Sequence, residues 1–118
     1  MTPPSGLTIR RAGLPDAELL AVLAARTFRD AFGPLGVHAG YALKANALPA
    51  ILRGVRAAGL AAEAGSLGEL RAAEREGFGP AERILNGNGR TAVEAEFAAR
   101  EGVHSVNADH IAELDLLE

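Results

Sequence analysis

Short apolar runs alternate with amphipathic segments from Val37 to the end of the chain. Apolar runs of four to eight residues bounded by glycine or polar corners are typical of β-strands. We therefore predict four strands, at His38–Ala45, Leu60–Ala64, Arg83–Asn86 and Val103–Asn107.

The segments between these strands carry helical periodicity and helix-boundary signals. The first, Pro49–Ala58, places Ile51, Leu52, Val55 and Ala58 on one face, and Gly59 ends it. Two later helices open with a hydroxyl residue followed three positions on by glutamate, the spacing of a capping box. These pairs are Ser66 with Glu69 and Thr91 with Glu94, and the helices end at Gly77 and Gly102.

The apolar side chains of these later helices define their expected inner faces. Leu67, Leu70 and Ala73 line the helix after Ser66, and Val93 and Phe97 are expected to face inward from the helix after Thr91. A last helix is expected from the spacing of Ile111, Leu114 and Leu117.

The first 36 residues form a separate segment in this interpretation. Leu7–Arg10 is expected to be a short strand, and Pro15 with Asp16 marks a helix start. That helix carries an apolar stripe that includes Leu20 and Phe28, and Gly33 ends it. Residues 1–36 are therefore predicted to be an N-terminal strand and helix, and residues 37–118 to be the repeated unit.

The predicted strands begin roughly 20 residues apart and alternate with helices, which indicates a parallel α/β sheet with right-handed crossovers. An open doubly wound sheet and a partial (β/α)8 TIM-type barrel both fit this pattern. A whole barrel takes about 250 residues. About four βα units after an N-terminal helix would thus make half a barrel at most.

Composition narrows the class of protein further. The chain has 118 residues, enough for one domain, and a net charge of −3 with no basic stripe, which argues against a nucleic-acid partner. It has no cysteine, so neither disulfides nor thiolate metal sites are expected. No apolar run approaches the length of a membrane span, and no secretory signal is evident, so we expect a cytoplasmic protein.

Polar residues stand at the C-terminal end of every predicted strand, where functional groups of parallel α/β folds are found. They are Lys44 and Asn46, Glu63 and Ser66, Asn86 and Asn88, and Asn107 and Asp109. Lys44 is the single lysine among 12 basic residues. Its amine could serve as a Schiff-base nucleophile. From position alone, a lysine that merely extends to solvent is the simpler interpretation.

The wider segment resembles a known family. Tyr41-Ala42-Leu43-Lys44-Ala45-Asn46, followed by Ile51, Leu52, Val55 and Gly59, is similar to the cofactor-attachment segment of the pyridoxal-phosphate-dependent ornithine/diaminopimelate/arginine decarboxylases. These enzymes have an alanine-racemase-like barrel. Leu60 to Leu70 resembles their second strand and helix start, and Ile84–Arg90 resembles their third strand and turn. The spacing favours the diaminopimelate branch.

The resemblance implies a function and a cofactor. Lys44 would bind pyridoxal 5'-phosphate covalently and act in amino-acid decarboxylation, with Glu63 and Asn88 beside the cofactor. Diaminopimelate decarboxylation in lysine biosynthesis is the expected activity, with a small amino acid as substrate and a homodimer as the full-length family's assembly. Ser66 and Glu69 are better explained as a helix cap.

The sequence also departs from the family pattern. The family's usual opening segment is not found before Ala24, and its phosphate-binding turn and β-rich second domain would follow Glu118. We therefore expect a truncated chain. A non-catalytic pyridoxal-phosphate-binding barrel protein and an inactive fragment remain alternatives. A fourth interpretation, an acyl-CoA-dependent N-acetyltransferase, rests only on a short match between Thr8 and Phe28.

Overall fold

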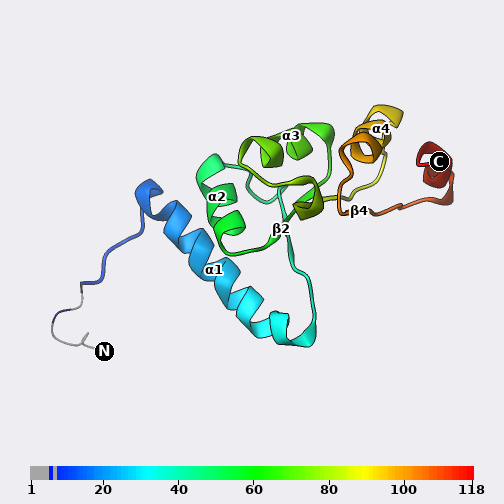
Figure 1. Cartoon of the computed structure of the whole chain (residues 1–118). Coiled ribbons are helices and arrows are strands. Elements are labelled where there is room, and N and C mark those ends of the chain that lie inside the picture. The colour runs from blue at the N-terminus through cyan, green and yellow to red at the C-terminus, as the bar shows by residue number, and fades with distance from the viewer. Residues whose placement is uncertain (1–5, 7) are drawn as a thin grey trace.

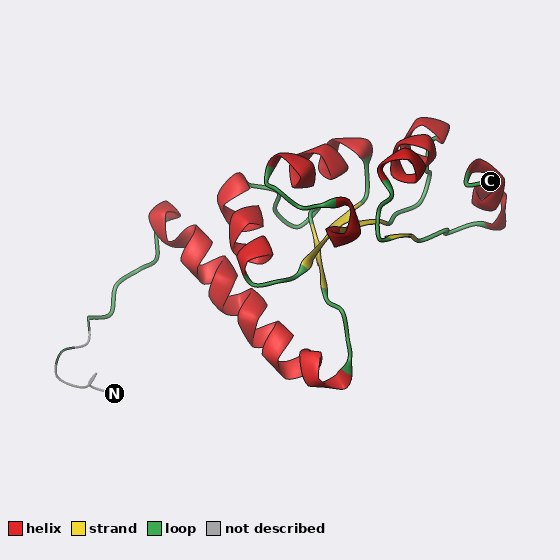
Figure 2. Ribbon diagram, viewed as in Figure 1, coloured by secondary structure: helices red, strands yellow, loops and turns green. Residues whose placement is uncertain are grey.

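The computed structural model describes residue 6 and residues 8–118, and these form alternating helices and strands (Figures 1 and 2). The α-helices are α1 (Ala17–Phe32), α2 (Pro49–Ala57), α3 (Leu67–Arg75) and α4 (Ala92–Glu101). The strands are β1 (Gly40–Ala42), β2 (Ala61–Ala64), β3 (Arg83–Leu85) and β4 (Ser105–Val106). Four short 3-10 helices complete the order: η1 (Leu14–Asp16), η2 (Gly33–Leu35), η3 (Pro80–Glu82) and η4 (Ile111–Leu116).

The four strands form one parallel sheet in the order β1-β2-β3-β4. Each strand pairs with the next along the chain, as in Tyr41 opposite Ala62 and Ala64 opposite Leu85. The prediction of four parallel βα units is confirmed, although each strand is shorter than expected. The predicted strand at Leu7–Arg10 is wrong where it can be assessed, because Thr8–Arg10 have no strand structure, and Leu7 lies outside the described residues.

One face of the sheet is covered by α2, α3 and α4, which follow one another along it (Figure 1). Ala62, Ala64 and Leu85 point to this face and are almost fully buried. Glu63 and Ile84 alternate with them and are only half-buried. Since side chains alternate across a strand, Glu63 and Ile84 lie on the opposite face, which in a barrel would point inward.

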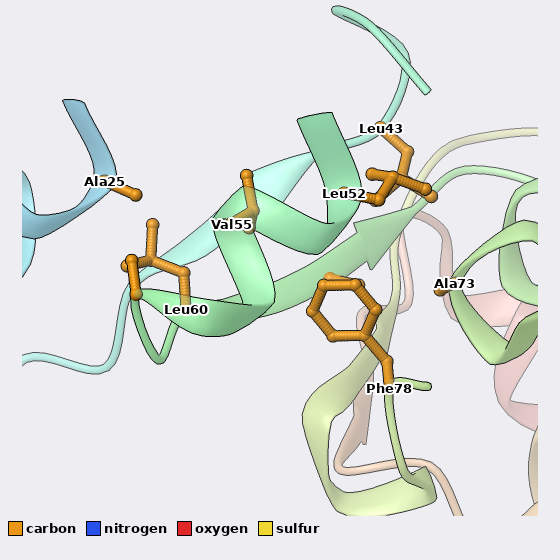
Figure 3. Packing of buried hydrophobic residues seen from close by; sticks show 9 residues of the cluster. Ala25, Leu43, Leu52, Val55, Leu60, Ala73 and Phe78 are labelled. Carbon is orange, nitrogen blue, oxygen red and sulfur yellow. The ribbon is translucent and has the colours of Figure 1, made fainter. Parts of the chain in front are cut away.

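The core between sheet and helices has two parts. One contains Leu43, Leu52, Val55 and Phe78, and reaches Ala25 of α1 (Figure 3). The other lies under α3 and α4, around Leu70, Leu85 and Phe97. Many contributors are alanines, so helices and sheet approach closely and the few large side chains supply most of the buried apolar area.

The predicted helix caps are present. The Ser66 Oγ accepts a hydrogen bond from the Glu69 amide at 3.2 Å, and the Glu69 carboxylate accepts one from the Gly65 amide. At α4, Thr91 and Glu94 form the reciprocal capping box. The capping box is thus reciprocal only at α4, since Glu69 accepts from the residue before the α3 cap. The Ser66 and Thr91 hydroxyls each accept from an amide that a helix start otherwise leaves unpaired, so α3 and α4 begin where the sequence indicates.

Helix α1 packs against α2 at a point of close approach. A Cβ on Gly54 would lie 2.7 Å from the Glu18 carbonyl oxygen and 2.9 Å from the Ala21 Cβ, so only glycine fits. The apolar stripe of α1 is otherwise open, with Leu20 and Phe28 each 48% exposed. These two residues line a pocket of about 930 Å³ between α1 and the β1 edge of the sheet.

Of the two α4 residues expected to face inward, Phe97 is buried but Val93 is not. Val93 is 61% exposed, whereas Ala95 and Ala98 sit at the centre of the buried face of α4. Val93 belongs to the first turn of α4. The last predicted helix is the 3-10 helix η4, and its Ile111 is 77% exposed while its Glu113 is buried. No helix in the described part of the chain is both long and apolar enough to cross a membrane.

Candidate functional site

The strand register brings one row of side chains across the inner face of the sheet. Ala42 pairs with Glu63, Glu63 with Ile84, and Ile84 with Ser105. Parallel strands end at the same edge of a sheet, so residues two positions further along the chain lie at the C-terminal rim. Those residues are Lys44, Gly65, Asn86 and Asn107.

The exit of β1 directs Lys44 away from the core. Leu43, directly before it, is 1% exposed and packs on the helix side, and its amide donates to the Glu63 carbonyl at 2.9 Å. Lys44 itself is exposed, and it has no ion pair among the described residues. The amine at this rim is thus available to a ligand.

The turn that holds Lys44 is closed by its neighbours. The Tyr41 hydroxyl donates to the Asn46 carbonyl oxygen at 3.0 Å, and the Asn46 Oδ1 accepts from the Leu48 amide at 3.0 Å. Burial of the Tyr41 ring raises the pKa of its hydroxyl, so the group remains a donor at neutral pH. Pro49 then starts α2, where a proline is tolerated.

Glu63 and Asn86 are linked directly across the sheet. The Asn86 Nδ2 donates to the Glu63 Oε1 at 2.8 Å, and the Asn86 Oδ1 accepts from the Gly87 amide at 2.9 Å. Both side chains are half-buried. The amide therefore holds the carboxylate in one orientation on the strand next to the one that carries Lys44.

Two glycines let the turns after β2 and β3 approach each other. Gly87 has φ +115°, and a Cβ there would lie 3.4 Å from the Gly65 carbonyl oxygen. A residue with a side chain rarely adopts the φ of Gly87, whereas a Cβ on Gly65 would be in ordinary contact with the Asn86 carbonyl oxygen at 3.7 Å. The rim at this point is consequently formed by backbone.

Asn88 lies two residues beyond Asn86 and is exposed, with no hydrogen bond from its side chain among the described residues. Its role beside a cofactor stays a prediction. The structure instead joins Asn86 to Glu63. Residue parity could have indicated this pairing, because Asn86 follows Ile84, the register partner of Glu63, by two residues and therefore lies on the same inner face.

The rim residues fit the aldehyde end of pyridoxal phosphate. They supply an accessible primary amine, a carboxylate held by an amide, and a stretch of backbone at Gly65 and Gly87 that carries no side chain. An amine and an aldehyde form a Schiff base, which is how lysine binds this cofactor. No group of His, Cys, Asp and Glu side chains able to hold a metal occurs within residue 6 and residues 8–118.

Solved structures similar to this chain decide between the two candidate architectures. The diaminopimelate decarboxylase from M. jannaschii matches with a TM-score of 0.77 and 29% identity, over 86% of this chain and 25% of that one. The I148L mutant of the Helicobacter pylori diaminopimelate decarboxylase, complexed with L-lysine, matches with a TM-score of 0.72 and 29% identity, over 86% of this chain and 25% of that one. The sheet is therefore part of a TIM-type barrel.

Sequence comparison agrees with this assignment. A probable chloroplastic diaminopimelate decarboxylase of rice is 44% identical over 89 residues, which is 75% of this chain and 18% of that protein. The diaminopimelate decarboxylase of Deinococcus radiodurans is 40% identical over 112 residues, 92% of this chain and 28% of that protein. The chain thus spans less than a third of the length of either relative.

The family model for the pyridoxal-dependent decarboxylase, pyridoxal binding domain, matches residues 21–118. This range contains all four strands and every rim residue described above. The cofactor expected from the Lys44 segment is the one that this domain binds. The chain belongs to the pyridoxal-dependent decarboxylase family and carries its pyridoxal-binding domain in part.

Proposed function

We propose that this chain supplies the cofactor lysine of a pyridoxal-phosphate-dependent amino-acid decarboxylase that acts on diaminopimelate, in the cytoplasm, as a step of lysine biosynthesis. The observation that carries the proposal is the position of Lys44, exposed at the C-terminal rim next to the strand that bears Glu63, whose carboxylate is held by Asn86. Relatives named diaminopimelate decarboxylase support the substrate.

The residues of this chain would divide the work as follows. Lys44 would hold the cofactor through its Nζ and later hold a proton for the α-carbon of the substrate. Glu63, oriented by Asn86, would border the cofactor together with Asn88. When bound, pyridoxal phosphate draws electrons from the α-carbon, so that carbon dioxide can leave.

The remaining parts of the proposal concern the assembled protein. The inner face of the sheet and the pocket beside α1 are uncovered in this chain. Further βα units would be needed to close a barrel around the cofactor and exclude water. We propose that the complete assembly is a homodimer, in which residues outside this chain recognise the far end of the substrate. We also propose that residues 1–36 are a segment distinct from residues 37–118.

The test is a pyridoxal-phosphate titration of the 118-residue chain, followed by borohydride reduction and peptide mapping. A reduced pyridoxyl adduct on Lys44 at stoichiometric yield supports the proposal, and carbon dioxide release from diaminopimelate would then establish the activity. The Lys44→Arg variant, which keeps the charge, should give no adduct in its peptide.

Other results have defined meanings. An adduct on Lys44 without carbon dioxide release from any amino acid favours a non-catalytic pyridoxal-phosphate-binding protein. An adduct confined to the N-terminal amine, or none, means that the chain by itself is inactive and contradicts the proposal.

A further inference from the structure

Arg90 has its guanidinium buried between two turns at the same rim. Its side chain is 2% exposed, although it follows the polar turn Asn86–Gly89. The Nη2 donates to the Asn107 carbonyl oxygen at 2.7 Å, and the Nη1 donates to the Glu113 Oε2 at 3.4 Å. One side chain thereby connects the turn after β3 with the turn after β4.

Glu113 completes this connection from the other side. Its side chain is 10% exposed, and its Oε2 also accepts from the Asp109 amide at 2.7 Å. These bonds lower the pKa of Glu113, first through the Asp109 amide and also through the charge of Arg90. A buried charge is stable only with such partners. The carboxylate therefore fixes η4 to the turn after β4.

The two connected turns carry rim residues. Asn86, which orients Glu63, opens the turn that ends at Arg90, and Asn107 follows β4. A shift of Arg90 would move the two turns relative to each other. Neither Arg90 nor Glu113 lies in the inner row of the sheet, so any effect on a ligand would act through Asn86 and Asn107.

We propose that Arg90 is a positioning residue, which through Glu113 and the Asn107 carbonyl sets the spacing of the β3 and β4 turns at the cofactor rim. The expected effect on cofactor affinity rests on the proposed function. The tie between the turns is independent of that function and can be measured without a cofactor.

Strand β3, which precedes the turn that ends at Arg90, offers a matched control. Arg83 begins β3 at the opposite end, its side chain is also 2% exposed, and it pairs with Glu101 at 3.9 Å. Each of the two arginines also has one buried nitrogen without a partner among the described residues. The Arg83→Gln variant therefore removes a comparable buried charge far from the rim.

The experiment compares Arg90→Gln, Arg90→Lys and Glu113→Gln with Arg83→Gln in the full chain. Hydrogen–deuterium exchange read by mass spectrometry should rise at least about tenfold in the segments 86–90 and 107–113 for Arg90→Gln, but not for Arg83→Gln. Affinity for pyridoxal phosphate should fall about tenfold or more, because small displacements of positioned groups carry penalties of this order.

The milder variants keep the inference testable if Arg90→Gln unfolds. Arg90→Lys retains the charge without the planar fork and should show intermediate exchange. Where Arg90→Gln folds, the Arg90→Gln/Glu113→Gln double variant should bind the cofactor no more weakly than Arg90→Gln, since both residues act as one unit.

Two outcomes separate the inference from the proposed function. Equal exchange at the rim in the Arg90 and Arg83 variants, or equal cofactor affinities, would overturn the positioning role. If the unmodified chain gives no adduct on Lys44, the proposed function fails, and the exchange comparison alone still decides whether Arg90 ties the turns.

Discussion

At the scale of single residues, Glu113 shows how a polar contact can override an apolar pattern. The spacing of Ile111, Leu114 and Leu117 predicts an amphipathic α-helix, yet Ile111 is exposed and Glu113 is buried. Two groups explain the burial of Glu113, the Asp109 amide and the Arg90 guanidinium, both of which donate to its Oε2. Arg90 is 23 residues away in sequence, so the periodicity of this segment alone could not have revealed its contact.

Glu113 should make the stability of the chain depend on pH. Its pKa in the folded chain is lowered, so the unfolded chain binds more protons as the pH falls. The stabilisation is thus present above the unfolded pKa, about 4.3, and is lost as the pH falls through the lower folded value. In Glu113→Gln, Tm should be lower at neutral pH, and its decline below about pH 5 should be shallower.

Circular dichroism melts between neutral and acidic pH would measure this. Glu96→Gln is the control, because Glu96 is exposed on α4 and makes no salt bridge in the described chain. Its curve should follow that of the unmodified protein. An acid decline in Glu113→Gln as steep as in the unmodified chain would refute the assignment.

At the scale of elements, the contact between α1 and α2 depends on Gly54. Replacing a helical glycine with alanine ordinarily stabilises by about 0.5–1 kcal/mol. Here the new Cβ would lie 2.7 Å from the Glu18 carbonyl oxygen, a backbone atom that cannot rotate away. Overpacking costs about 1–3 kcal/mol, so Gly54→Ala should destabilise the chain overall.

Gly68 provides the comparison within the same protein. A Cβ there would meet nothing closer than the Ser66 Oγ at 3.8 Å, so Gly68→Ala should be neutral or slightly stabilising. Urea unfolding of both variants would give the two free energies. A Gly54→Ala variant as stable as the unmodified chain would mean that α1 does not pack on α2 in this way.

The elements were predictable because independent signals agreed. Capping pairs, glycine stops and apolar runs all marked the same boundaries, as at Ser66, Thr91 and Gly102. The inner face of α4 was less predictable, since Ala95 and Ala98 rather than Val93 lie at its centre. Small residues allow close approach to the sheet, and a pattern of large apolar residues does not indicate that.

The candidate site was predictable in part. The place of Lys44 and Glu63 near one edge of the sheet could be predicted from the strand ends, because parallel strands bring those ends together. Their roles at a cofactor stay a prediction. The bond between Asn86 and Glu63 and the burial of Arg90 depend on register and on the turns, which the sequence does not specify by itself. Within the Asn86–Arg90 turn, the family resemblance places Asn88 beside the cofactor, and that assignment stays a prediction.

At the scale of the whole molecule, apolar side chains remain on the surface beside β1, the first strand of the sheet. Leu20 and Phe28 of α1 line the pocket next to β1, and each is 48% exposed. In the described chain β1 and β4 each pair with one neighbour only, which leaves both edges of the sheet open. Open edges and contiguous apolar surface both favour association.

We therefore expect the isolated chain to associate in a concentration-dependent manner, with the pocket beside α1 contributing most. The Leu20→Gln/Phe28→Gln variant should shift sedimentation-velocity profiles toward monomer, because it replaces the apolar lining without touching the buried core. Val93→Gln, at an exposed position of α4 away from the pocket, is the control and should leave the profile unchanged. If both variants reduce association equally, general surface hydrophobicity explains it; if neither does, the open edges of β1 and β4 remain the better explanation.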